Sequence, residues 1–370
     1  MIIKTLTLQN YRNYHSLTVS FSPSLNIFIG NNGQGKTNLL ESIYVLSATR
    51  SHRTTKDGEL LHWQEENTLI QGEIEKQTGS FPLSYAYSAK NKGKILRFNH
   101  LIQKKASEYI GQFHVILFCP DDLFLIKGSP SQRRKFLDQE LGFRNHYYLQ
   151  LLSQYQKLLK ERNQCLQKGK WDALYLDILD EQLSDYGSKI MRLRADFLNR
   201  LGEFATEIYR FLTQEKEELT LTYLPSIPLA KSEEEQKEVF LHYLQKNREK
   251  DQQQRATKLG IQRDDWILKM NNKEAKSFAS QGQQRLLILS IKLAEVEYIA
   301  QTLGEYPVLL LDDVMSELDD ERQMRLLQIL ENRVQTFITT TTLEHLEGKM
   351  KVKPKIFEVK AGEITTISEE

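Results

Sequence analysis

The stretch Gly30-Asn31-Asn32-Gly33-Gln34-Gly35-Lys36-Thr37 decides the fold, because it matches the pattern G-x-x-x-x-G-K-[ST] in full. Glycines in such a loop let successive backbone N–H groups converge on phosphate oxygens, and the positive end of the helix that follows attracts the same charge. Lys36 is expected to reach the β- and γ-phosphates of a nucleoside triphosphate, and Thr37 to offer its hydroxyl to Mg²⁺. The alternative is a glycine turn that merely caps a helix.

The residues on either side of this loop have the order that its mechanism requires. Leu25–Ile29 is short and mostly apolar, which predicts a buried strand running into Gly30. Apolar residues then recur at helical spacing: Leu39, Leu40, Ile43 and Leu46. A strand, a glycine loop and a helix in succession favour nucleotide binding over a simple helix cap.

Two acids follow the apolar run Val308–Leu311. A strand that ends in a carboxylate places it at the carboxyl edge of the sheet, where ligands of α/β proteins bind. We expect Asp312 to hold Mg²⁺, usually through water, and Asp313 to face the attacking water as orienting group or general base. The alternative is a buried strand that is simply followed by polar residues. The phosphate loop makes the functional interpretation the stronger one.

The segment Ser280-Gln281-Gly282-Gln283-Gln284 has two interpretations. Locally, Ser280 and Gln283 match the S-x-x-Q capping box at the start of the predicted helix Arg285–Ala300. Ser280, Gly282 and the exposed N–H groups of the helix start would also make a second phosphate-binding terminus. Since one nucleotide needs one such site per chain, the second predicts a partner copy. The segment resembles the ABC signature Ser-Gly-Gly-Gln, which in that superfamily binds the γ-phosphate of the opposite subunit.

Two further positions lie close to these motifs in the sequence. Asp319 looks like part of the D-loop that crosses the dimer interface in ABC ATPases, or is only a helix-start acid favoured by the macrodipole. Thr339–Thr342 ends the predicted strand Gln335–Thr340, where ABC ATPases usually carry a switch histidine. A threonine hydroxyl would then sense the γ-phosphate. The alternative is that the run is simply the end of a strand, where β-branched threonines are common. His345 is expected to be ordinary.

The middle of the chain has long stretches with helical spacing. Ser129 is the expected N-cap of a helix with Pro130 at its first position, and Gly142 its expected end. The other expected elements are helices over Tyr147–Leu166 and Trp171–Leu212, a break at Leu219–Leu224, a solvated helical stretch at Lys231–Lys258, strand-like residues at Trp266–Met270, and a terminal hairpin of Lys355–Val359 and Glu363–Ile367. We therefore expect an α/β fold. An ATPase domain of the ABC or SMC-head type would comprise residues 1–128 and 265–370, with a mainly α-helical lobe, residues 129–264, inserted.

Composition limits the classes of protein to which the chain can belong. Lys and Arg number 50 against 49 Asp and Glu, for a formal charge of +1, so contact with DNA would need clustered basic residues. The apolar runs are too short to span a membrane, which predicts no membrane partner. The chain has 2 cysteines, far apart in the sequence, and the N-terminus turns polar at once. These features favour a reducing cytoplasm over secretion.

With these residues in place, the chain resembles the RecF family of bacterial recombination mediators along essentially its whole length. The matching segments are Leu8–Tyr14, Pro120–Leu123, Gly128–Pro130, Arg133–Asp138, Phe278–Arg285 and Leu310–Asp319. On this resemblance Arg12 joins the residues expected to bind the nucleotide. One departure is visible: the family typically has Gly-Pro-His-Arg-Asp-Asp before the signature, whereas this chain has Gly260-Ile261-Gln262-Arg263-Asp264-Asp265.

The resemblance implies an ABC-like head that binds ATP and Mg²⁺, dimerises with ATP sandwiched between subunits, and clamps double-stranded DNA near single-strand junctions. It also implies RecR and RecO as partners in directing RecA onto gapped DNA, with slow hydrolysis for release. The basic candidates for phosphate contacts are Arg50, His52 and Arg53, then Lys90–Lys94, Lys104-Lys105 and Arg133-Arg134-Lys135. Each is otherwise a solvated surface run, and Arg134 has the i,i+4 spacing to pair with Asp138.

Two other classes share part of this pattern. A transporter ATPase subunit has all three nucleotide motifs, but it normally has a much shorter insertion and needs a membrane partner. A structural SMC-type protein carries a long arm, and Ser129–Lys258 is too short and too interrupted to be that arm.

Overall fold

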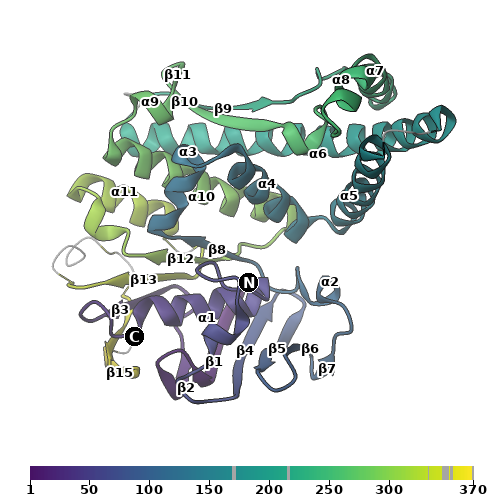
Figure 1. The fold of residues 1–370 in the computed structure, drawn as a ribbon. Coiled ribbons are helices and arrows are strands. Elements are labelled where there is room, and N and C mark those ends of the chain that lie inside the picture. The colour runs from purple at the N-terminus through teal and green to yellow at the C-terminus, as the bar shows by residue number, and fades with distance from the viewer. Residues whose placement is uncertain (169–171, 215–216, 332, 344–349, 351–352, 369–370) are drawn as a thin grey trace. The chain divides into compact units, whose positions relative to one another are not determined.

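The structure, a computed structural model, describes residues 1–370 except 169–171, 215–216, 332, 344–349, 351–352 and 369–370. The chain divides into two compact units (Figure 1). The first comprises Met1–Asp122, Glu207–Glu217 and Gln281–Glu370, and the second Leu123–Thr206 and Glu218–Ser280. The first unit is therefore assembled from both ends of the chain.

A mainly parallel sheet carries the predicted nucleotide motifs of the first unit. Its strand order is β15-β14-β3-β13-β12-β8. The strands are β3 (Leu25–Ile29), β8 (Val115–Phe118), β12 (Val308–Asp312), β13 (Thr336–Thr340), β14 (Lys355–Lys360) and β15 (Glu363–Ser368). Strand β3 pairs in parallel with β13 and β14, and only the terminal hairpin β14–β15 is antiparallel. The strands expected at β3, β12 and β13 and the terminal hairpin are confirmed.

A second sheet in the first unit is wholly antiparallel, in the order β2-β1-β4-β5-β6-β7. Its strands are β1 (Ile2–Tyr11), β2 (Tyr14–Ser20), β4 (Asn67–Lys76), β5 (Gly79–Ser88), β6 (Gly93–Phe98) and β7 (Leu101–Ile102). The pairing of β1 with β2 places the turn at Arg12 and Asn13. Asn13 of that turn donates a hydrogen bond to Gln34 of the glycine loop.

Helix α1 (Lys36–Ala48) lies between the two sheets of the first unit (Figure 1). Its buried Leu39, Leu40 and Ile43 join Phe28 of β3 and Leu6 of β1 in one apolar core. The other helices and 3₁₀ turns of this unit are η1 (Asp57–Leu60), α2 (Ala106–Tyr109), α10 (Gln281–Leu303), η4 (Met315–Glu317) and α11 (Asp320–Leu330), and η2 (Pro120–Leu123) ends at the boundary of the units. This core fixes the start of α1, and with it the glycine loop.

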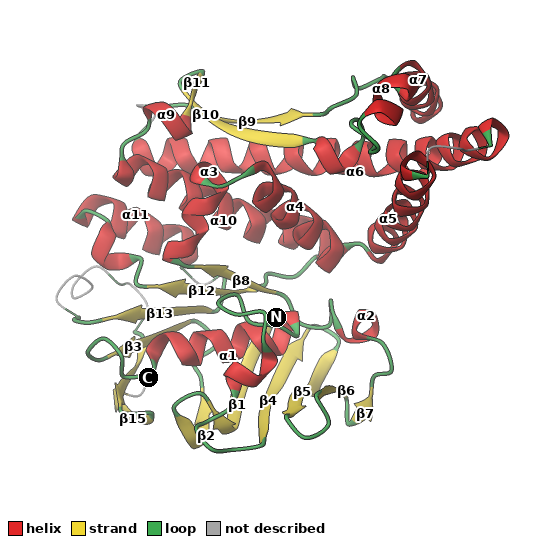
Figure 2. Ribbon diagram, viewed as in Figure 1, coloured by secondary structure: helices red, strands yellow, loops and turns green. Residues whose placement is uncertain are grey.

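The second unit is mostly helical (Figure 2). Its elements are α3 (Phe124–Lys127), α4 (Pro130–Arg144), α5 (His146–Gln167), α6 (Ala173–Thr213, in this unit up to residue 206), β9 (Leu219–Leu224), α7 (Glu233–Lys246), α8 (Arg248–Gln253), η3 (Ile261–Arg263), β10 (Asp265–Met270), β11 (Lys273–Glu274) and α9 (Ala275–Phe278). The strands form a sheet in the order β11-β10-β9. The indole of Trp266 on β10 is fully buried, with its ring centroid 5.7 Å from that of Phe136 on α4.

The structure corrects two expectations for the middle of the chain and confirms a third. Helix α4 begins after Ser129 with Pro130 at its first position, as expected, but it runs past Gly142 to Arg144. A Cβ at Gly142 would lie 2.6 Å from Leu149 Cδ2, so this glycine allows α4 to approach α5 and does not end the helix. The break expected at 219–224 is confirmed, because strand β9 separates α6 from α7, whereas the stretch 231–258, expected to be solvated, buries Phe240 and Leu244 of α7.

The division into units differs in three segments from the domain ranges expected from the sequence, and the first of these, residues 123–128, belongs to the second unit. Residues 265–280 belong to the second unit, because β10 pairs with β9 along its whole length. Residues 207–217, which include the last turns of α6, belong to the first unit. Within the described part of the chain, every helix is too short or too polar to cross a membrane.

Candidate nucleotide-binding site

The glycine loop follows β3 and leads into α1, and its glycines have conformations that a side chain would disfavour. Gly30, Gly33 and Gly35 have φ angles of +152°, +81° and +121°. A Cβ at Gly30 would lie 2.4 Å from the carbonyl oxygen of Val359, and one at Gly35 would lie 2.5 Å from Asn13 Nδ2. The loop therefore needs glycine both for its backbone shape and for its close approach to neighbouring chain segments.

Lys36 directs its ammonium group into the loop. Its Nζ donates hydrogen bonds to the carbonyl oxygens of Gly30 at 2.5 Å and Asn31 at 3.0 Å. Burial lowers the pKa of Lys36, and the nearby charges of Asp313 and Asp312 oppose that effect. The single cation of this loop is thus held where the phosphate groups of a nucleotide are expected, while Asn31, Asn32 and Gly33 are exposed at its tip.

The end of β12 meets the start of α1 at the carboxyl edge of the parallel sheet. Thr37 Oγ1 donates to Asp312 Oδ1 at 3.1 Å, and Thr339 Oγ1 on β13 donates to the same oxygen at 2.7 Å. The next residue, Asp313, has a φ of +55°, and its backbone N–H donates to Thr339 Oγ1 at 2.9 Å. Burial raises the pKa of Asp312, against the effect of the two hydroxyl donors. The predicted metal ligands, Thr37 and Asp312, therefore lie side by side.

The donor set at this edge fits Mg²⁺. A hydroxyl and a carboxylate are hard oxygen ligands, and Mg²⁺ in phosphate sites takes one or two protein ligands and completes its shell with water and phosphate. Thr37 and Asp312 would hold the ion, which would neutralise charge on the β- and γ-phosphates. Among the described residues there is no cluster of three or more His, Cys, Asp or Glu side chains that would hold a metal without a phosphate.

Two turns from distant parts of the chain support the tip of the glycine loop. From the β1–β2 turn, Asn13 Nδ2 donates to the carbonyl oxygen of Gln34 at 3.0 Å, and Tyr14 Oη donates to that of Gly35 at 2.9 Å. From the β14–β15 turn, the backbone N–H of Gly362 donates to the same carbonyl of Gln34 at 3.1 Å. The N–H of Ala361 donates to Gln34 Oε1 at 2.7 Å. No local sequence pattern predicts these contacts.

Arg12, expected to bind the nucleotide, makes a bidentate ion pair with Glu41 on α1. Its Nε and Nη2 lie 2.8 and 2.7 Å from the two carboxylate oxygens, and its backbone has a φ of +52°. Burial alone would raise the pKa of Glu41, but hydrogen bonds from Arg12 and Ser51 and the charge of Arg53 lower it. The guanidinium thus ties the β1–β2 turn to α1, and any contact with a nucleotide would be additional to this pair.

The signature segment lies at the start of α10. Ser280 immediately precedes the helix, and Gly282 and Gln283 are in its first turn. Gln283 Nε2 donates to Glu217 Oε1 at 2.5 Å, and two residues further along the helix Arg285 pairs with Glu317 of η4 at 2.8 Å. A Cβ at Gly282 would meet no atom within 4 Å, so this glycine leaves the helix start open.

Asp319 is the N-cap of α11, and its carboxylate accepts the backbone N–H of Arg322 at 2.9 Å. The local interpretation of this residue as a helix-start acid is therefore confirmed, and its role at a dimer interface stays a prediction. His345 lies outside the described residues.

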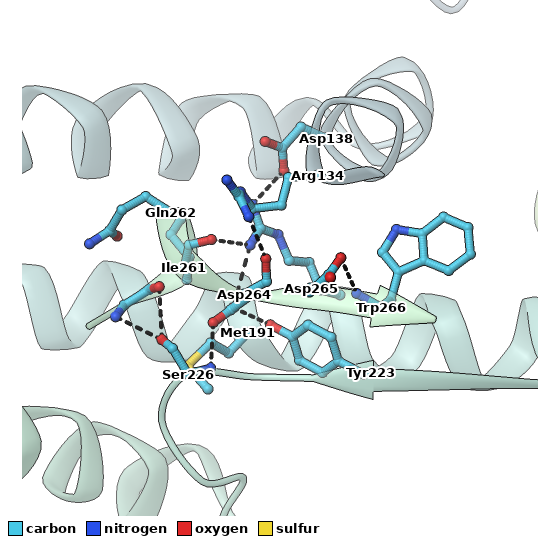
Figure 3. Close-up of polar contacts among 12 residues, drawn as sticks. Arg134, Asp138, Met191, Tyr223, Ser226, Ile261, Gln262, Asp264, Asp265 and Trp266 are labelled. Carbon is cyan, nitrogen blue, oxygen red and sulfur yellow. Dashed lines mark hydrogen bonds and ion pairs between the residues drawn. The ribbon is translucent and has the colours of Figure 1, made fainter. Parts of the chain in front are cut away.

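The segment Gly260–Asp265, which departs from the family pattern, belongs to a buried polar network in the second unit (Figure 3). Arg194 on α6 donates to the carbonyl oxygen of Ile261 at 2.8 Å and to Asp138 Oδ1 at 2.6 Å. It also lies 3.5 Å from Asp264 Oδ2. Arg194 and Asp264 are each only 1% exposed. Asp138, which the spacing could have paired with Arg134, is therefore paired with Arg194.

Gln262 stands where the family pattern has histidine, and its side chain has structural partners. Its Oε1 accepts a hydrogen bond from Tyr155 Oη at 2.7 Å, and its Nε2 donates to the carbonyl oxygen of Leu259 at 2.7 Å. Gly260 has a φ of +115°, and a Cβ there would lie 2.3 Å from Tyr155 Oη. The substitution of the pair by Ile261 and Gln262 thus leaves this segment packed and hydrogen-bonded.

The structure narrows the basic candidates for DNA contacts. Arg133 makes a bidentate pair with Asp265, and Lys94 pairs with Asp57 at 2.8 Å. Burial lowers the pKa of His52 to about 4, so His52 carries no charge at neutral pH. Besides the paired Lys94, the exposed lysines of these clusters are Lys90, Lys92, Lys104, Lys105 and Lys135. They remain predictions for phosphate contacts.

Comparison with known proteins agrees with this geometry. Residues 2–365 match the family model of the RecF/RecN/SMC N-terminal domain. The chain is 48% identical to the DNA replication and repair protein RecF of Enterococcus faecalis, covering 98% of each chain, and 48% identical to that of Streptococcus gordonii, covering 98% of this chain and all of the relative.

Solved structures extend the comparison to the fold. A structure of the recombination mediator protein RecF with ATP, from the RecFOR pathway, superposes with a TM-score of 0.88 at 32% identity, covering 99% of this chain and 97% of that one. An SMC head bound to the C-terminal winged-helix domain of ScpA, at 14% identity and a TM-score of 0.58, shares the fold alone. The chain belongs to the RecF family of DNA replication and repair proteins, within the larger group of RecF, RecN and SMC ATPases.

Proposed function

We propose that this protein is an ATP-dependent DNA clamp of recombinational repair. It binds Mg–ATP in the glycine loop, closes with a second copy of itself, and holds double-stranded DNA next to single-strand junctions. With RecO and RecR it helps to load RecA onto gapped DNA, and slow hydrolysis of ATP releases the clamp. The cytoplasm is its expected location.

One observation carries the proposal: Lys36, Thr37 and Asp312 converge at one edge of the parallel sheet, with Asp313 next to them. Thr37 and Asp312 are 3.1 Å apart although the sequence separates them widely, and Lys36 points into the glycine loop. This is the set of groups that positions a triphosphate and its metal ion for transfer of the γ-phosphoryl group. The relatives that match over the full length carry the name RecF, which supports DNA repair as the setting.

Slow turnover follows from the residue after Asp312. Asp313 is the expected group that orients the attacking water, and its side chain is one methylene shorter than the glutamate usual in ABC transporters. Ser316 Oγ donates to Asp313 Oδ1 at 3.1 Å, which further restrains the carboxylate. A carboxylate held further from the water gives looser alignment and a lower hydrolysis rate.

The dimer is supported by the second phosphate-binding terminus. Ser280, Gly282 and the first N–H groups of α10 would meet the γ-phosphate held by the partner copy, because a helix start attracts anions through its dipole and its unpaired donors. The open space around Gly282 suits close approach of another molecule. Each nucleotide would then be held by Lys36 of one copy and Ser280 of the other.

The test is binding of gapped DNA with ATP, a non-hydrolysable analogue or ADP, with sedimentation of the same samples. We expect dimers and DNA retention with the triphosphates and neither with ADP. Ser280→Arg should bind ATP normally and remain monomeric, while Gln301→Arg, which adds the same charge near the far end of α10, should dimerise. A protein that stays monomeric at saturating ATP and Mg²⁺, or that binds DNA without regard to the nucleotide, would contradict the clamp.

A further inference from the structure

The indole of Trp63 stands in solvent beside the supports of the glycine loop. Its side chain is 87% exposed, whereas Trp266 is fully buried. Tryptophan offers a large flat apolar surface, and leaving that surface in water forgoes a favourable burial. An exposed indole near the glycine loop is therefore a candidate to contact a planar ring of a bound ligand.

The backbone on both sides of Trp63 is held in place. Leu61 forms a bridge with Tyr11 at the end of β1, and the N–H of His62 donates to the carbonyl oxygen of Asn10 at 2.9 Å. After the indole, Glu65 Oε2 accepts a hydrogen bond from Asn10 Nδ2 at 3.0 Å. Trp63 is thus presented from a turn that is fixed to β1 on each side, which reduces the entropy lost when it contacts a ligand.

The same end of β1 connects this turn to the glycine loop. Arg12 Nη1 donates to the carbonyl oxygen of Glu59 at 2.7 Å, just before the turn. The next two residues, Asn13 and Tyr14, donate to the carbonyl oxygens of Gln34 and Gly35. Residues 59–65, the β1–β2 turn with Tyr14, and the glycine loop are therefore connected by hydrogen bonds.

We infer that Trp63 stacks on the adenine ring of the nucleotide held by the glycine loop of the same chain. The γ-phosphate end of that nucleotide is fixed beside Thr37 and Asp312, at the β12 side of the loop. The nucleoside end therefore leaves the loop away from β12, where the β1–β2 turn and residues 59–65 lie. This inference rests on the proposed binding of ATP and adds the subsite for its base.

The charge around Trp63 favours the base of a nucleotide over a base in a DNA strand. Glu65 and Glu66 follow the indole closely, and Glu66 is exposed. These carboxylates repel the phosphates on either side of every base in a strand. The adenine ring of ATP is neutral and lies well away from its own phosphates, so it can stack on the indole without that repulsion.

Tryptophan fluorescence gives a direct test. The signal of Trp63 is the difference between the wild-type spectrum and that of Trp63→Phe, since both proteins keep Trp171 and Trp266. We expect Mg–ATP to quench this difference signal and to protect it from acrylamide. Inorganic tripolyphosphate, which has the phosphates without the base, should do neither. Protection by an oligothymidylate strand but not by ATP would overturn the inference, since the stacking base would then belong to DNA.

Affinity provides the second measurement. A stacked base contributes enough that Trp63→Ala should weaken ATP binding about tenfold, and Trp63→Phe less. Tripolyphosphate should bind Trp63→Ala as it binds the wild type. Leu101→Ala, which truncates another side chain that is 69% exposed, is the matched control and should leave both affinities unchanged.

The outcomes separate this inference from the proposed function. If Trp63→Ala binds ATP as tightly as the wild type while Lys36→Ala binds it weakly, the stacking is wrong and the nucleotide site stands. If the wild type binds neither ATP nor tripolyphosphate, both the site and its adenine subsite are overturned.

Discussion

Thr339 Oγ1 donates a 2.7 Å hydrogen bond to Asp312 Oδ1, and so connects β13 to the predicted metal ligand on β12. The same hydroxyl accepts the backbone N–H of Asp313, a non-glycine residue with a φ of +55°. One threonine therefore orients the carboxylate that would hold Mg²⁺ and stabilises the turn that carries Asp313, the carboxylate expected to face the attacking water.

Replacing Thr339 by valine should slow hydrolysis more than it weakens nucleotide binding. A hydrogen bond to a charged group is worth about 1.5–3 kcal/mol, so the single-turnover rate with Mg²⁺ should fall about tenfold or more. ATP affinity without Mg²⁺ should be unchanged, because Lys36 and the loop are not altered. Thr339→Ser keeps the hydroxyl and should retain most of the rate; an equal loss of rate in both variants would contradict the hydrogen bond as the cause.

Gly362→Ala should loosen the tip of the glycine loop. The residue has a φ of +83°, and a Cβ would lie 2.3 Å from the carbonyl oxygen of Asn13. The clash would displace the N–H that supports Gln34 and weaken ATP binding. Gly304→Ala is the matched control, since Gly304 has a φ of +73° with no atom within 4 Å of a Cβ. Calorimetric titration with ATP should find weaker binding for Gly362→Ala alone, and similar affinities in the two variants would contradict the contact.

His52 should make the first unit sensitive to acid. Burial next to Tyr44 lowers the pKa of His52 from 6.5 to about 4, so the unfolded chain takes up a proton at a higher pH than the folded one. Above pH 6.5 His52 is neutral in both the folded and the unfolded chain, so it does not change the free energy of unfolding with pH. As the pH falls from 6.5 toward 4, that free energy decreases by up to about 3 kcal/mol. Urea unfolding of the wild type and of His52→Phe should be measured across this pH range. As the pH falls, the free energy of unfolding of the wild type should decrease more than that of the variant. A difference independent of pH would exclude a titrating His52.

Arg194→Ala should destabilise the second unit strongly. The change leaves the carboxylate of Asp264 buried without its cation, and breaking a buried pair costs about 3–5 kcal/mol. Arg192→Ala, two residues earlier on α6, removes one exposed hydrogen bond to the carbonyl oxygen of Lys231 and should cost less than about 0.5 kcal/mol. Denaturant unfolding curves of the two variants would measure the contrast, and comparable losses would contradict the assignment of Arg194 to a buried network.

The sequence was most informative where function requires a local pattern. The glycine loop, the strand expected at Val308–Leu311 and the helix expected at Arg285–Ala300 are all present, because each depends on neighbours within a few residues. The strand β4 was missed although Thr68, Ile70 and Ile74 alternate with more exposed residues, since Gly72 interrupts the apolar pattern. Its pairing with β1 joins residues far apart in the sequence, which no local pattern records.

The supports of the nucleotide site could not be predicted for the same reason. The bidentate pair of Arg12 with Glu41 and the contact of Gly362 with Gln34 join positions that approach each other only when the sheets form. Gly142 was misinterpreted because glycine both ends helices and allows close packing, and only the position of Leu149 distinguishes the two. Patterns in sequence thus identified the groups expected to act on the nucleotide but not those that hold them.

The contact of Gln34 with the turn at Gly362 also orders events during synthesis. The loop that would hold the phosphates is made long before β14, which pairs with β3, and before the turn that supports the loop. A growing chain therefore carries the whole glycine motif without this support until Gly362 has been added. Competence to bind a nucleotide is in this way tied to synthesis of the β14–β15 turn, and a chain that stops before that turn lacks the support of its own loop.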